Sequence, residues 1–125
     1  MRTTCRTQNG VRICHLNFSN MPTEAEALVT ITEAKAVIAA EKPGTVYTIT
    51  DVTGSRVTSK IRAALHDLTA HNKPYVKFGA VVGLTNIQRV ILTGIIQLTG
   101  RRLVAASSMD DAVKAILVEA GRTRA

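Results

Sequence analysis

The residues best suited to chemistry lie in one segment, Val46 to Ser59, with the sequence VYTITDVTGSRVTS. Its first half is rich in β-branched residues and ends on Asp51, and Gly54 then interrupts the run. We expect a helix to follow, with hydroxyl side chains at its start. The N–H groups and the dipole at a helix N-terminus favour an anion or a phosphate group. The alternative is structural, because Ser and Thr at a helix start commonly cap the helix.

The pattern therefore predicts a small polar site at the turn between a strand and a helix. A phosphate group at this place would be stabilised by N–H donors and by the two basic side chains of the turn. Its charge and bulk would also disturb a docking face. The candidate phosphorylation or anion-binding residues are Asp51, Thr53, Gly54, Ser55, Arg56, Thr58, Ser59 and Lys60.

Catalytic chemistry has little support in the spacing of the residues. A serine nucleophile needs a base, but no Ser-His pairing is evident and the GxSxG motif is absent. His66 and His71 fall a turn or more from Ser55 on the expected helix, and a lone Asp51 at a strand end is commonly a turn residue. We therefore expect a protein that is not an enzyme, with no catalytic residues and no cofactor.

Length and composition favour one globular domain over residues 1–125, with 46% hydrophobic residues and no tryptophan. The net charge of +7 invites a nucleic-acid interpretation, but the excess lies at the ends. Three arginines fall within the first twelve residues and two within the last four, whereas the body carries eleven bases against nine acids. We expect an edge strand with basic character over 1–10 and a basic tail over 118–125, and we do not expect nucleic acid as a partner.

Cys5 and Cys14 are too few for a metal cluster or a disulfide scaffold, and the three histidines lack metal-ligand spacing. The two cysteines flank a turn signal at Asn9-Gly10 and can therefore lie near each other. Free thiols in the cytoplasm are the expectation. No run is long enough for a membrane span, and the first residues lack the apolar segment of a signal peptide.

Hydrophobic periodicity and turn signals predict nine elements. A hairpin is expected over 2–7 and 11–18, followed by a helix that begins near Thr23 and stops at Pro43-Gly44. Strands are expected over 45–50, 75–82 and 102–106, and helices after Gly54, after Gly83 and after Ser108.

The order ββαβαβαβα predicts an α/β fold with about five strands, mainly parallel, and four helices. Ligands of such sheets bind beyond the carboxyl ends of the strands. These ends are the turns at 51–55 and 82–85, so two helix N-termini converge there if their strands are neighbours. The expected core residues are Ile13, Leu28, Ile31, Val46, Ile61, Leu65, Val76, Val81, Ile87, Ile91, Leu103, Ala112 and Ile116.

The element order, with DVTG after the central strand, resembles the STAS fold of bacterial anti-sigma-factor antagonists. The segments NFSN, ITEAKAVIAAEKPG, TITDVTGS, HNKPYVKFGAVVGL, LTGRRL and SSMDDAVKAIL are similar to small stand-alone proteins of the STAS or CRAL-TRIO-like group, over about residues 11–117. In the antagonists a serine at the start of the second helix is phosphorylated. Asp51 and Gly54 match that motif, and Thr53 stands where its first serine would be.

The match departs from the family at the phosphorylated residue. The chain continues after Gly54 without the second Asp or the second Gly of the antagonist motif, and Lys60 occupies the ungapped position of the phosphorylated serine. Ser55, Thr58 and Ser59 are all candidates for it.

The resemblance implies a non-enzymatic regulatory or protein-interaction module, controlled by phosphate or a nucleotide at the Asp51–Ser59 turn. The alternative that it implies is a binder of a small apolar or lipid ligand held between helices and sheet. A protein partner is expected, and the hydrophobic composition and the edge hairpin also suggest a homodimer.

Overall fold

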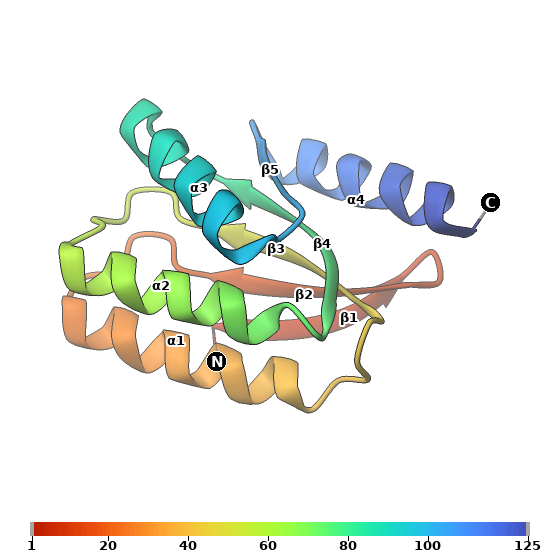
Figure 1. Cartoon of the computed structure of the whole chain (residues 1–125), viewed down its shortest axis with the longest axis horizontal. Coiled ribbons are helices and arrows are strands. Elements are labelled where there is room, and N and C mark those ends of the chain that lie inside the picture. Colours follow the sequence, from red (N-terminus) through yellow and green to blue (C-terminus); the bar gives the residue numbers. More distant parts are fainter. Residues whose placement is uncertain (1, 125) are drawn as a thin grey trace.

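Five strands form one mixed sheet in the computed structural model, which describes the backbone of residues 2–124 and the side chains of residues 2–122. The elements follow the order ββαβαβαβα (Figure 1). The strands are β1 (Thr3–Gln8), β2 (Val11–Asn17), β3 (Val46–Asp51), β4 (Val76–Val82) and β5 (Leu103–Ala106). The helices are α1 (Glu24–Ala39), α2 (Ser59–Asn72), α3 (Asn86–Thr99) and α4 (Met109–Arg124).

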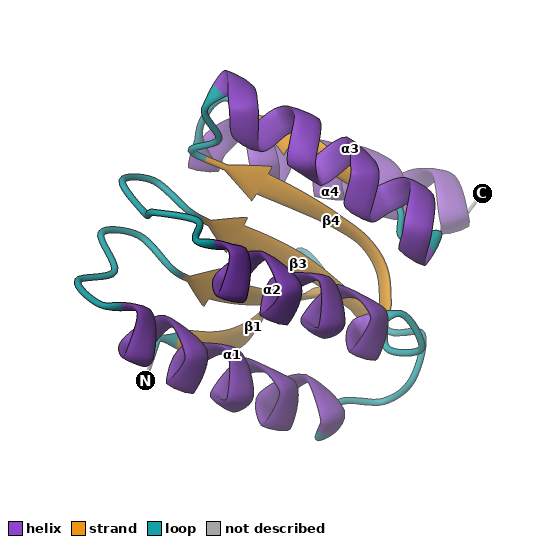
Figure 2. Cartoon of the chain, turned by 60° about the vertical axis from the view of Figure 1, so that its left-hand side comes forward, coloured by secondary structure: helices purple, strands orange, loops and turns teal. Residues whose placement is uncertain are grey.

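The strands lie in the sheet in the order of the chain, β1-β2-β3-β4-β5. β1 pairs antiparallel with β2 through the Asn9-Gly10 turn, and the other three pairs are parallel. The fold class predicted from the sequence, a mainly parallel sheet with an antiparallel edge hairpin, is confirmed. The helices α1, α2 and α3 lie on one side of the sheet, and α4 lies on the other (Figures 1 and 2).

Alternation along the strands divides the core into two layers. In β2, Ile13 belongs to the layer under α4, whereas Cys14 and Leu16, on the opposite face of the strand, belong to the layer under α1 and α2. A side-chain period of two residues gives this division directly. Near-continuous apolar runs in β3 and β4 reflect burial on both faces.

Helix α3 is packed less deeply than the sequence predicts. Ile87, an expected core residue, is 75% exposed, and that prediction is wrong. The inner face of α3 instead carries Gln88, Leu92 and Ile95, and Gln88 also completes a capping box with Thr85. The expected residues Leu28, Leu65, Ile91 and Leu103 are partly buried, and the other expected core residues are buried.

Two helices differ from the sequence prediction at their ends. Helix α2 begins at Ser59 and is capped by Thr58, so residues 55–58 form a loop and Ser55 is not at the helix start. Helix α4 continues to Arg124 and includes most of the segment 118–125 that we expected to be a tail. Within residues 2–124, no helix combines the length and apolar character needed to cross a membrane.

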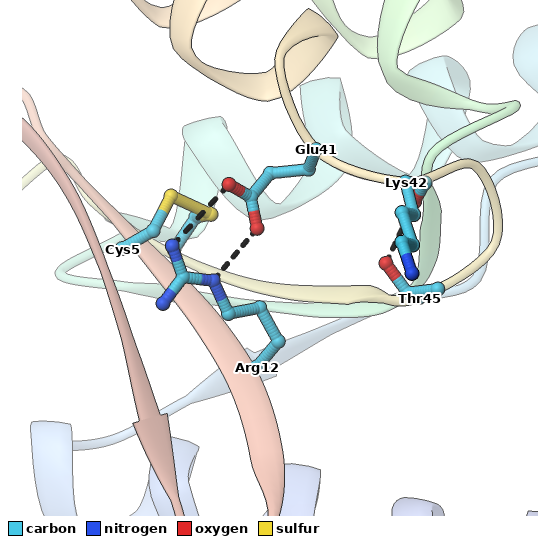
Figure 3. The surroundings of a disulfide bond; sticks show 6 residues. Cys5, Arg12, Glu41, Lys42 and Thr45 are labelled. Carbon is cyan, nitrogen blue, oxygen red and sulfur yellow. Dashed lines mark hydrogen bonds and ion pairs between the residues drawn. A yellow bond between two sulfur atoms is a disulfide. The ribbon is translucent and has the colours of Figure 1, made fainter.

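The cysteines are joined, which corrects the expectation of free thiols. Cys5 and Cys14 face each other across the β1–β2 pair and form a disulfide, with their Cα atoms 3.9 Å apart. Next to the disulfide, the Arg12 guanidinium binds both oxygens of Glu41, at 2.7 and 3.3 Å (Figure 3). This pairing lowers the pKa of Glu41 and raises that of Arg12. The disulfide therefore joins the two strands of the hairpin, and the ion pair between Arg12 and Glu41 joins the hairpin to the residues just after α1.

Candidate functional site

The turn after β3 is shaped by the carboxylate of Asp51. One of its oxygens accepts hydrogen bonds from the backbone N–H of Thr53 at 3.0 Å and from the Thr53 hydroxyl at 2.7 Å. Gly54 follows with a φ of +70°, and a Cβ at this position would collide with the side chain of Asn20. Asp51, Thr53 and Gly54 therefore build the turn, as the structural alternative from the sequence supposed.

Two of the three candidate phosphorylation hydroxyls are engaged in tertiary contacts. The hydroxyl of Ser55 donates to the carbonyl oxygen of Phe18. The hydroxyl of Thr58 donates to the Glu24 carboxylate at 2.6 Å and accepts from the N–H of Ile61 at 3.2 Å. A carboxylate therefore lies beside the N-terminus of α2 and disfavours a second anion at Thr58.

The remaining candidates lie on the surface. Ser59, the first residue of α2, is exposed, and so are Arg56 and Lys60. Ser59 is thus the candidate hydroxyl that a modifying enzyme can reach without breaking a described hydrogen bond.

The turns after β3 and β4 lie side by side, as expected for neighbouring parallel strands. Asp51 pairs with Val82 in the register of the two strands. Gly83 has a φ of +86°, and a Cβ there would collide with Thr53. The side-chain amide of Gln88, in the first turn of α3, donates to the Ser55 carbonyl oxygen at 3.3 Å. The start of α3 therefore lies against the turn that precedes α2.

A cavity of about 90 Å³ lies between α2, α3 and the sheet. No local sequence pattern reports the separation of two helices, so this cavity could not be predicted from the sequence. Its lining is mostly apolar side chains, with a few hydroxyls, amides and arginines. The lining residues are Leu16, Thr48, Thr50, Val52, Val57, Arg62, Leu65, Leu68, Thr69, Asn72, Val81, Leu84, Gln88, Ile91, Leu92, Ile95, Arg101 and Leu103.

Gly79 lets two side chains of the cavity lining lie over β4. A Cβ at Gly79 would lie 2.5 Å from the Thr48 hydroxyl oxygen and 2.7 Å from a methyl carbon of Leu103. Both of those residues line the cavity. The absence of a side chain in the middle of β4 therefore allows side chains of its two neighbouring strands to approach its backbone closely.

Arg101 lies at the end of the cavity nearest the C-terminus of α2. The residue is 5% exposed, and its guanidinium donates to the carbonyl oxygen of Thr69 at 3.0 Å. Burial lowers the pKa of Arg101 to about 10, so the group is a cation at neutral pH. Arg101 was not among the residues singled out from the sequence, where it is one of two adjacent arginines.

The cavity lining suits binding. Among the described residues that line it, none carries a carboxylate, a thiol or an imidazole. The available polar groups are hydroxyls, amides and two guanidinium groups, which donate hydrogen bonds and orient a ligand.

Comparisons of the chain with protein-family models, with curated proteins and with solved structures found no match.

Proposed function

We propose that this protein is a non-enzymatic binding domain that holds a small apolar ligand between α2, α3 and the sheet. The observation that supports the proposal is the apolar cavity of about 90 Å³. One water molecule needs roughly 10–15 Å³ measured in this way, so the cavity is several times larger than a single water site. The cavity thus has room for a short chain or a single ring.

Helix α3 is suited to admit such a ligand. Only Ile95 and Thr99 are buried among its described residues, while Ile91 and Leu92 are half-buried over the cavity. Few buried apolar contacts hold a helix weakly, so a small outward movement of α3 costs little and enlarges the cavity. This is the alternative function expected from the sequence, and the cavity supports the proposal that its ligand lies between α2 and α3.

The test is a titration with 1-hexanol followed by backbone amide chemical shifts. We expect shifts in Leu65–Thr69 of α2 and Ile91–Ile95 of α3. Ile91→Trp, which fills the cavity, should abolish them, whereas Ile87→Trp on the exposed side of the same helix should leave them unchanged. No saturable shifts, or shifts that Ile91→Trp does not affect, would refute binding in this cavity.

A regulatory role at the Asp51–Ser59 turn is the second candidate. The bond between Gln88 and Ser55 favours it, because a movement of α3 would be transmitted to the turn. Ser59 lies exposed between Arg56 and Lys60 in sequence, at the start of a helix that favours phosphate. We propose that a protein partner binds the surface of the Asp51–Ser59 turn, in the manner of the STAS-type modules that the chain resembles.

This second candidate is tested by titration with phosphate and nucleotides, followed by amide shifts of residues 54–60. Glu24→Gln should strengthen anion binding, because it removes the carboxylate beside Thr58. Shifts confined to other regions, together with the absence of phosphorylation in cells, would leave the turn as a helix cap.

Two further expectations from the sequence are kept as proposals. The chain is proposed to act in the cytoplasm. It is also proposed to form a homodimer through the exposed apolar residues of α3, which are Ile87, Val90 and Leu98. Sedimentation of a 13.4 kDa species at high micromolar concentration would exclude the dimer.

A further inference from the structure

We propose that Arg101 binds the acidic head of the ligand, so that the cavity between α2 and α3 selects small amphipathic monocarboxylates. This inference rests on the proposed function, because it names the class of ligand for the same cavity. It is carried by a buried guanidinium group that faces an apolar space without a carboxylate partner.

The partners of Arg101 differ from those of other arginines in the chain. Arg12 is bound by Glu41, and the adjacent Arg102 is bound by Glu119. Arg12 and Arg102 are more exposed than Arg101. Arg101 is buried, and the hydrogen bond described for its guanidinium goes to a backbone carbonyl. Within the described part of the chain, no carboxylate forms an ion pair with it.

A buried charge without an opposite charge is costly for a protein to keep. The Thr69 carbonyl lies in the last turn of α2, so the helix dipole offsets part of this cost. One hydrogen bond nevertheless uses one of the five donors that a guanidinium group offers. A ligand anion would use more of them and would neutralise the charge.

Two polar groups of the cavity lining, the Arg101 guanidinium and the Thr48 hydroxyl, lie close to each other at Gly79. The second terminal nitrogen of Arg101, Nη2, lies 3.6 Å from the point that a Cβ of Gly79 would occupy. The hydroxyl oxygen of Thr48 lies 2.5 Å from the same point. Gly79 thus lets the Thr48 hydroxyl and the Arg101 guanidinium lie close together over the sheet, where a Cβ would collide with the hydroxyl. The planar guanidinium matches the two oxygens of a carboxylate.

The rest of the lining determines the other end of the ligand. Leu65, Leu92 and Ile95 are apolar and lie along the same cavity. A ligand with a carboxylate at Arg101 would therefore extend a short apolar chain or ring between α2 and α3. The small volume argues for a chain of a few carbons in the closed structure rather than for a complete lipid.

The experiment compares hexanoate with 1-hexanol at neutral pH in the intact protein, by isothermal titration and amide chemical shifts. We expect hexanoate to bind about tenfold or more tightly than hexanol, because a hydrogen bond to a charged group contributes at least the free energy of a tenfold change in affinity. Arg101→Met should remove the preference while hexanol still binds. It should also raise the Tm of the ligand-free protein, because an unpaired buried charge is lost.

Each outcome decides between the proposals. If hexanol binds and hexanoate binds no more tightly, the cavity is a binding site and the role of Arg101 is refuted. If neither binds, the proposed function itself fails. If Arg101→Met lowers the Tm and leaves the preference for hexanoate unchanged, Arg101 only caps α2 and the inference is wrong.

A second variant covers the case in which Arg101→Met does not fold. Arg101→Lys keeps the positive charge but loses the planar fork. We expect it to fold and to bind hexanoate several-fold more weakly, with hexanol unaffected. Unchanged binding of hexanoate to Arg101→Lys would contradict recognition by the guanidinium.

Discussion

The side-chain amide of Gln88 donates a hydrogen bond to the carbonyl oxygen of Ser55 across 3.3 Å, and this bond joins the first turn of α3 to the turn after β3. The same side chain accepts from the N–H of Thr85 at 3.0 Å and completes the cap of α3. Gln88 therefore links the helix that covers the cavity to the surface proposed for a partner.

This double role leads to the first prediction. Gln88→Glu keeps an oxygen for the N–H of Thr85 but removes the donor to Ser55. We expect faster amide exchange in residues 55–58 and a loss of about 0.5–1.5 kcal/mol in the free energy of unfolding. Thr85→Ala is the matched control, because it weakens the cap and leaves the bond to Ser55 in place. Equal exchange in residues 55–58 for both variants would show that this bond does not hold the turn.

The second prediction concerns two apolar residues of different burial, Leu68 in α2 and Ile87 in α3. Leu68→Ala should cost about 2–5 kcal/mol, because Leu68 is 4% exposed in the layer under α2. Ile87→Ala should change the free energy of unfolding by less than about 0.5 kcal/mol, since Ile87 is 75% exposed. Urea unfolding of both variants measures the difference. Similar losses would mean that α3 packs in another phase or that a second chain covers Ile87.

The difference in burial between Leu68 and Ile87 shows that some features of the fold can be predicted from the sequence and others cannot. Strands and helices follow from period and turn signals, and the cap that Ser108 gives to α4 is visible in the sequence. The phase of α3 is ambiguous, because apolar residues occur on more than one side of it. Ser55 lies in the loop before α2, where its hydroxyl donates to the carbonyl oxygen of Phe18, 37 residues away, and no local pattern reports this contact.

The site depends even more on tertiary structure. Arg101 and Arg102 are equivalent in the sequence, yet one is buried at the cavity and the other is exposed and pairs with Glu119. Gly79 looks like a weak point within a strand, whereas in the fold it allows the close approach of Thr48 and Leu103 to the backbone of β4. The turn at Asp51 could be located from its residues, but the engagement of its hydroxyls could not.

The third prediction concerns the disulfide between Cys5 and Cys14. It closes a loop of about ten residues, so reduction should lower the free energy of unfolding by about 2.5–3 kcal/mol. Thermal unfolding with and without a reducing agent measures this loss. The double variant Cys5→Ser, Cys14→Ser should be insensitive to the reducing agent. Alkylation of both cysteines in the untreated protein would show that the bond does not form in solution.

The last prediction concerns the dependence of stability on pH, which we attribute to His15. Burial lowers the pKa of His15, the Asp51 carboxylate raises it and Arg6 lowers it further. A histidine with a lowered pKa in the folded state stabilises the fold above its unfolded pKa of 6.5. Below that value the unfolded chain binds the proton first. The free energy of unfolding should therefore fall as the pH decreases from 7 towards the folded pKa.

Glu41 and Asp67 also have lowered pKa values, but their unfolded values of 4.5 and 3.8 place their effect at lower pH. The range from pH 7 to pH 5 therefore isolates the contribution of His15 from theirs. His15→Gln should flatten the slope in urea unfolding over this range. Asp51→Asn keeps the oxygen that accepts from Thr53 but removes the charge that favours the imidazolium, so it should steepen the slope. A slope unchanged in His15→Gln would mean that another group carries the dependence, because only the loss of this imidazole separates the variant from the parent protein.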